Sequence, residues 1–145
     1  MAPPPVGPEL EIWGAILLGL VIGFIELVFV HQDERGLGWL GHGLHAVPFT
    51  ILFTFITMNV GFVLSKIPKL GIASNPVTEA IVIVVIGIIA MAKIAAAAAI
   101  AGNTRIGEKK IHILVIGLLI IAAPYAWKYG LKAVLMPFLN SLPFT

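Results

Sequence analysis

Two charged residues lie inside apolar stretches of this sequence, where an isolated charge is costly. Glu26 precedes the polar segment that begins at His31 by five residues, which is about 7–8 Å of helix. Lys93 is flanked by isoleucine, methionine and alanine. Embedded ionisable groups pair with one another or mark a path for ions or protons. The helices that carry Glu26 and Lys93 are expected to end on the same side, so we predict that the two are coupled, directly or through water, as a structural ion pair or as part of a relay. The alternative is that Lys93 extends outward toward the membrane surface.

A second set of side chains with coordinating atoms gathers near the predicted helix ends. Imidazole nitrogens and carboxylate oxygens suit divalent zinc, iron or copper. These metal-ligand candidates are His31, Asp33, Glu34, His42, His45 and His112. Their spacing matches no established zinc motif, so ordinary interfacial histidines are the alternative. Haem ligation by His45 and His112 is disfavoured, because both are expected near a surface and not deep in a bundle.

Several other kinds of chemistry find no support in the sequence. The chain has no cysteine, which excludes disulfides, thiolate metal sites and thiol catalysis. It contains no nucleophile elbow, phosphate-binding loop or HExxH element. It also lacks the basic patch with interleaved aromatic residues that is typical of nucleic-acid binding. We therefore expect no nucleic-acid partner, and an enzymatic function is disfavoured.

Long apolar segments separate the polar clusters and must position them. Of the 145 residues, 59% are hydrophobic and 11% are charged, whereas soluble proteins carry about 25% charged residues. A helix needs roughly 20 apolar residues to cross a bilayer. We therefore predict an all-α, polytopic membrane protein in which about four transmembrane helices pack as a bundle. The predicted spans are residues 12–30, 44–64, 78–101 and 111–127.

The last part of the chain differs from these spans. Pro124 lies within the last predicted span and predicts a kink there. The tail at 128–145 mixes lysine and tyrosine with apolar residues, which favours an interfacial helix over a further span. The whole chain, residues 1–145, is predicted to form a single integral, multi-pass domain in the cell membrane.

Small and mildly polar residues form stripes on two of the predicted helices. Ala15, Gly19 and Gly23 recur every four residues on one face of the first helix, and Glu26 continues that face. Small residues at this spacing let helices approach closely, so internal packing is predicted, with a homo-oligomer seam as the alternative. The stripe of the second helix consists of Thr50, Thr54, Thr57 and Gly61. It predicts helix packing, with a polar pore lining as the alternative, and Asn59 beside it requires its own partner.

Three functions remain open at this point. The favoured one is a non-enzymatic subunit of a membrane complex or a self-associating helical bundle, whose partners are the lipid bilayer and other membrane subunits or copies of itself. The alternative is a small ion or proton channel or transporter that uses Glu26 and Lys93. The third is a metal-dependent membrane enzyme or redox protein that uses the histidines and a divalent transition metal.

Overall fold

A computed structural model describes residues 8–33, 38–72, 75–101 and 110–141, without the side chains of residues 38, 42, 70 and 97–101. All regular elements in these ranges are helical, as predicted. In chain order they are α1 (Ile12–Asp33), α2 (Gly38–Met58), α3 (Val60–Lys66), η1 (Pro68–Leu70), α4 (Pro76–Ala101), α5 (Lys110–Ala126), the π-helix η2 (Trp127–Leu131) and α6 (Lys132–Leu139). Four helical segments are long and apolar enough to cross a membrane: Ile12–Asp33, Trp39–Met58, Pro76–Ala96 and Lys110–Leu139.

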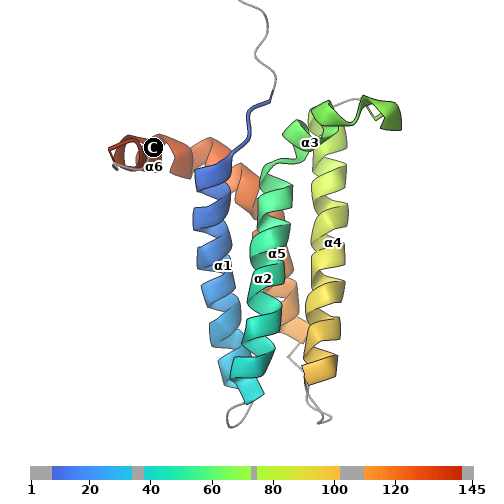
Figure 1. Cartoon of the computed structure of the whole chain (residues 1–145), viewed down its shortest axis with the longest axis vertical. Coiled ribbons are helices and arrows are strands. Elements are labelled where there is room, and N and C mark those ends of the chain that lie inside the picture. Colours follow the sequence, from blue (N-terminus) through green and yellow to red (C-terminus); the bar gives the residue numbers. More distant parts are fainter. Residues whose placement is uncertain (1–7, 34–37, 73–74, 102–109, 142–145) are drawn as a thin grey trace, which may run out of the picture.

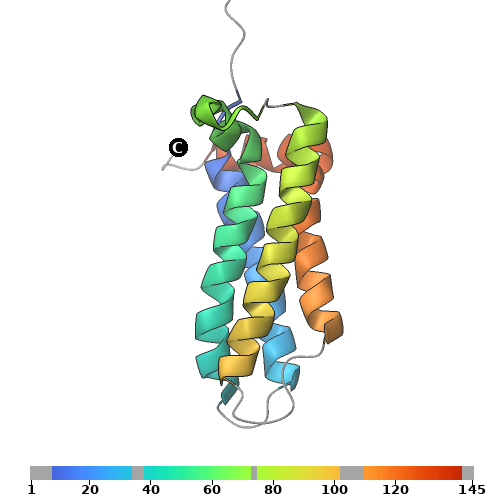
Figure 2. The ribbon, with the colours of Figure 1, turned by 90° about the vertical axis from the view of Figure 1, so that its right-hand side faces the viewer.

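The four long helices stand side by side in one bundle, and each runs antiparallel to the preceding one (Figures 1 and 2). Both α1 and α4 pack against α2 and α5, whereas α1 and α4 make little contact with each other. They therefore occupy opposite corners, and α2 meets α5 between them. The start of α1 and the helix α6 lie at the same end of the bundle, where α6 projects sideways (Figure 1).

The small-residue stripe of α1 packs against α2. A Cβ atom added at Gly19 would lie 3.3 Å from the Cα of Ile51, and one at Gly23 would lie 3.1 Å from Cγ1 of Val47. Both distances are shorter than ordinary carbon–carbon contacts of about 3.5–4.0 Å, so glycine permits this approach. Each step of four residues forward along α1 is matched by four residues back along α2, as expected for antiparallel helices.

Other glycines extend the same packing device to the rest of the bundle. In each case the glycine receives a large apolar side chain from the facing helix, and a Cβ atom would overlap it. Such pairs lock two helices in one register, because moving either helix by a residue would drive the large side chain into the backbone. Gly43 receives Leu27, Gly87 receives Ile121, and Gly117 receives Met91.

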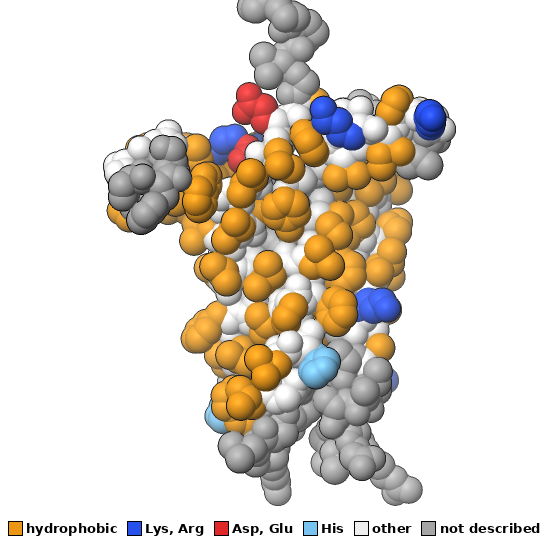
Figure 3. Space-filling view, in the orientation of Figure 1, with side chains coloured by type: hydrophobic (Ala, Val, Ile, Leu, Met, Phe, Trp, Pro, Cys, Tyr) orange, Lys and Arg blue, Asp and Glu red, His pale blue; other side chains and the backbone are white. Residues whose placement is uncertain are grey.

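Apolar side chains fill the interior and also cover the outside. The largest buried cluster joins α1, α4 and α5 through Ile22, Ile94, Ile116 and Ile120. On the outside, Phe24 is 66% exposed. Figure 3 shows hydrophobic side chains along the flank of the bundle, several charged ones near the end at which α1 begins, and a further basic one on the flank. An apolar exterior of this extent is unusual for a protein in water.

The sequence predicts the second helix at residues 44–64, but α2 starts at Gly38 and ends at Met58. Asn59 interrupts it. The side-chain Nδ2 of Asn59 donates to the Phe55 carbonyl at 2.9 Å, and its main-chain N–H turns to the Ile56 carbonyl at 3.1 Å. The side chain thus takes the acceptor that an α-helix reserves for the main chain. Helix α3 follows as a separate element.

The last helix turns sideways for a reason that begins at Pro124. Proline has no N–H, so the carbonyl four residues earlier, that of Ile120, loses its usual helical partner. The hydroxyl of Thr57 on α2 donates to this carbonyl at 3.2 Å. The predicted kink is therefore accompanied by a contact between α2 and α5, and the π-helix η2 begins three residues beyond the proline.

We predict that Thr57 and Pro124 are energetically coupled. Thr57→Val should lower the free energy of unfolding by about 1–3 kcal/mol, because the buried Ile120 carbonyl loses this hydrogen bond. In a Pro124→Ala background the loss should shrink, because the restored main-chain N–H at position 124 can serve that carbonyl. Thermal unfolding in detergent, followed by circular dichroism, measures both effects. Thr57→Ser is the matched control, and additive effects of the two substitutions would contradict the coupling.

Candidate functional site

Glu26 is fully buried in the bundle and is bound to the threonine stripe of α2. The Thr50 hydroxyl donates to Oε2 of Glu26 at 2.7 Å, and both residues are 0% exposed. The other carboxyl oxygen, Oε1, has no hydrogen-bond partner among the described residues. The carboxyl group is thus held from one side by α2. Thr50 can reach it because Gly19 and Gly23 allow α1 and α2 to approach closely.

Lys93 lies elsewhere, so the predicted direct ion pair with Glu26 does not form. Lys93 is exposed on α4, and its neighbour Ile94 is the residue that points into the core. The two charges do approach from the same end of the bundle, as expected. However, α1 and α4 occupy opposite corners of the bundle. Glu26 and Lys93 therefore lie at similar depths but on helices that are not neighbours.

The threonines of α2 face the interior and bind the main chain. Thr50, Thr54 and Thr57 are at most 1% exposed. The Thr54 hydroxyl donates to the Thr50 carbonyl at 2.8 Å, and that of Thr57 donates to the Thr54 carbonyl at 3.0 Å as well as to Ile120. Because these hydroxyls serve carbonyl groups and not one another, they form no hydroxyl-to-hydroxyl chain. Gly61, the last member of the stripe, faces the Glu79 carboxylate instead.

At the opposite end of the bundle from α6, one of the histidines joins α1 to α5. His112 Nδ1 lies 2.7 Å from Oδ2 of Asp33, an arrangement in which the imidazole N–H donates to the carboxylate. The His112 ring also stacks on Phe29 with 4.2 Å between the ring centroids. The Asp33 side chain is only 2% exposed. This contact pins the end of α1 against the start of α5.

The other described candidates for metal ligands, His31 and His45, make separate contacts. His31 places its ring edge against Trp39 at 4.9 Å between centroids, and His45 donates to the Gly41 carbonyl at 2.8 Å. Glu34 and the side chain of His42 lie outside what the structure describes. Within the described part of the chain, no three histidine, aspartate or glutamate side chains come together in a way that could hold a metal ion.

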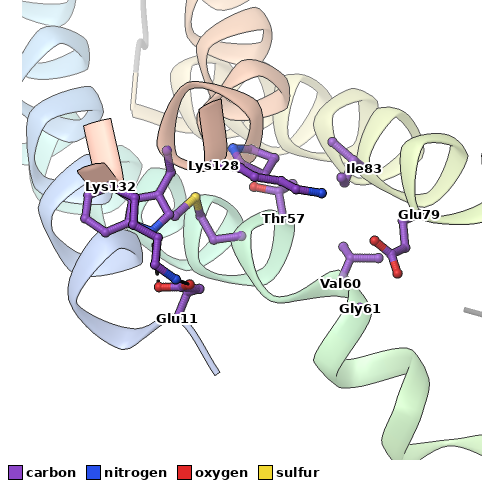
Figure 4. Close-up of a pocket in the computed structure, with 11 residues that line it drawn as sticks. Glu11, Thr57, Val60, Gly61, Glu79, Ile83, Lys128 and Lys132 are labelled. Atoms are coloured by element: carbon purple, nitrogen blue, oxygen red, sulfur yellow. Dashed lines mark hydrogen bonds and ion pairs between the residues drawn. The ribbon is translucent and has the colours of Figure 1, made fainter. Parts of the chain in front are cut away.

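The end at which α1 begins contains a cavity of about 290 Å³ (Figure 4). Its walls are partly apolar and are supplied by the ends of α2 and α5, the starts of α3 and α4, and by η2 and α6. Charged side chains of both signs line it, and in Figure 4 Glu11 and Lys132 lie on one side and Glu79 on the other. The charged lining residues are Glu11, Glu79, Lys128 and Lys132. Such a lining suits a small group that is itself partly apolar and partly polar.

Glu11 organises this end of the bundle, and sequence reasoning missed it. Its carboxylate accepts a hydrogen bond from Trp127 Nε1 at 3.1 Å and forms an ion pair with Lys132. Its main-chain N–H donates to Asn59 Oδ1 at 2.7 Å. Asn59 thereby finds the partner that the sequence required. The signal that could have found it is topological. After four antiparallel helices the chain returns to the end at which it began, so the basic residues that follow α5 lie near Glu11, which precedes α1.

No protein-family model, curated protein or solved structure matches the chain. Among the described residues, Glu26 places a carboxyl group in the interior, the end near α6 has a charged cavity, and Lys93 is exposed on the outer flank of α4.

We predict that Glu26 is coupled to Thr50 and not to Lys93. Glu26→Met and Thr50→Val should each change the unfolding free energy, and their double mutant should show a coupling of about 0.6 kcal/mol or more, as found for hydrogen bonds between helices in membranes. The cycle with Glu26→Met and Lys93→Met should show coupling near zero. Thermal unfolding in detergent measures both cycles, with Thr50→Ser as the control. A larger coupling to Lys93 than to Thr50 would contradict this arrangement.

Proposed function

We propose that this chain is an integral, multi-pass protein of the cell membrane and works as a non-enzymatic subunit of a membrane complex. Membrane insertion is supported by the four long apolar helices and by their apolar exterior. Lipid chains would cover that exterior, which water would not solvate. The two ends of the bundle, by contrast, carry most of the charged side chains, as expected for surfaces in contact with water and lipid headgroups.

One contrast carries the assignment to a complex. The buried polar groups are used to hold the helices together, as with Glu26 and Thr50, or Thr57 and the Ile120 carbonyl. Lys93, in contrast, is exposed on an otherwise apolar flank and has no partner among the described residues. A charge on a lipid-facing helix surface costs at least ~2.5–3.5 kcal/mol on insertion scales. A surface that retains such a charge is better suited to contact with another protein than with lipid alone.

We predict that the chain is extracted from carbonate-washed membranes of its source in a complex with other, dissimilar chains. In a mild detergent it should migrate well above the mass of one 15.4 kDa chain with its micelle. Native electrophoresis followed by mass spectrometry measures the mass and the composition of the complex. Migration as a single chain would contradict the proposal. Migration as copies of this chain alone would favour a self-associating bundle instead.

A second candidate, a proton or ion relay, is favoured by the unpartnered oxygen of Glu26. Oε1 is buried and available to a water molecule or a proton, and embedded carboxyl groups often belong to such paths. The hydrogen bonds of Thr54 and Thr57 to carbonyl groups argue against a continuous route along α2.

The two functions differ in the proton permeability that they predict. If the chain is a subunit without a relay, vesicles that contain it should conduct protons no faster than vesicles with the Glu26→Gln variant. A pH-sensitive dye inside the vesicles reports the flux after a pH jump. Flux that requires Glu26, and that disappears in Glu26→Gln while the fold is intact, would favour the relay.

A further inference from the structure

Lys93 lies well inside the predicted membrane layer. It precedes the end of α4 at Ala101 by eight residues, which is about 12 Å of helix. Helix α4 has 26 residues, or about 39 Å, against a hydrocarbon core of about 30 Å. If the core is centred on the helix, the Cα atom of Lys93 lies roughly 7–8 Å inside its boundary.

The geometry of the helix makes escape to the nearer membrane surface unfavourable for this lysine. In an α-helix the Cα–Cβ bond is tilted toward the N-terminus. The nearer surface for Lys93 lies toward the C-terminus of α4. Its side chain therefore starts in the direction of the bilayer centre and would have to fold back to bring the ammonium group to the headgroups. A partner at the same depth satisfies the charge without this reversal.

The surface beside Lys93 has the spacing of a helix–helix contact. Val85, Ile89, Ala92 and Ala96 are exposed and follow one another at intervals of four, three and four residues. This alternation is the repeat by which two helices pack along a shared seam. Lys93 directly follows Ala92 and flanks the seam, at the position where charged residues select a partner helix. Ala92 and Ala96, the two small residues of this surface, permit close approach.

We propose that the α4 seam, formed by Val85, Ile89, Ala92 and Ala96 with Lys93 beside it, docks a transmembrane helix of a different membrane protein. That helix carries an aspartate or glutamate opposite Lys93. Its carboxylate neutralises the ammonium group inside the membrane, and its apolar residues cover the seam. This inference rests on the proposed function and specifies the partner.

The described residues of a second copy of this chain do not offer the required carboxylate. Glu26, the described acidic residue that lies deep within a span, is fully buried and bound to Thr50. The other described acidic residues, Glu9, Glu11, Asp33 and Glu79, lie at or near helix ends. Charge complementarity at the depth of Lys93 therefore calls for another protein.

Designed peptides test the docking directly. The full chain is reconstituted in phosphatidylcholine vesicles with a leucine- and alanine-rich transmembrane peptide that carries one aspartate at the depth of Lys93, and association is measured by energy transfer between fluorophores. We expect this peptide to bind about tenfold more tightly than the same peptide with leucine, a factor typical of one polar contact between helices. Lys93→Met should remove the difference, and Lys110→Met, at an exposed helix start, should not.

A charge exchange keeps the test independent of folding. The Lys93→Asp variant should no longer bind the aspartate peptide and should instead bind a peptide with lysine at the same depth. Thermal unfolding of Lys93→Met should match that of the unsubstituted chain, because the side chain is exposed and has no partner among the described residues. Equal binding of the aspartate and leucine peptides would overturn the proposal.

Other occupants of the surface give distinct results. Lys93-dependent energy transfer between two labelled copies, without peptide, would overturn the proposal in favour of self-association. A requirement for anionic lipid in place of the peptide would overturn it in favour of a headgroup contact. A native complex that survives Lys93→Met would overturn this assignment and leave the proposed function standing, whereas a chain that migrates alone in its own membranes would overturn both.

Discussion

The close approach of α1 to α2 is the constraint from which the rest of the structure follows. Gly19 and Gly23 let the two backbones come near enough for Ile51 and Val47 to fill the space that side chains would otherwise occupy. Only at this separation can the short Thr50 side chain reach the Glu26 carboxyl group. A larger residue at either glycine would separate the helices and leave the buried acid without its donor, which is costly in a low-dielectric interior.

The same pair of helices sets the arrangement at the end near α6. Asn59 terminates α2 beside the start of α1, and there it holds the main chain of Glu11. The carboxylate of Glu11 is then free to bind Trp127 and Lys132, which follow the proline of α5. Glu11 thus joins the break after α2, the start of α1 and the segment that follows α5. This network also shapes the charged cavity.

The polar side chains within the long helices point either into the bundle or outward. The inward-facing hydroxyls of Thr50, Thr54 and Thr57 and one oxygen of Glu26 are hydrogen-bonded to neighbours, and these contacts hold the helices together. The outward-facing Lys93 is the described charge for which the bundle provides no match at depth. In the membrane location that we propose, the hydrocarbon around the bundle can neither solvate nor screen a charge as water does, so an outward lysine needs a partner outside this chain. For this reason we place the interaction surface on α4 and not in the interior.

The sequence by itself determined the helical class, the four long apolar segments, the packing role of the glycine and threonine stripes, and the need of Asn59 for a partner. Those properties follow from composition and helical periodicity, which are local. The break at Asn59, the role of Glu11 and the separation of Glu26 from Lys93 were decided only by the tertiary structure. The position of a residue along its helix, and the end of the bundle nearest to it, can be predicted from the sequence. Which helices become neighbours depends on how all four pack, and this packing places α1 and α4 at opposite corners.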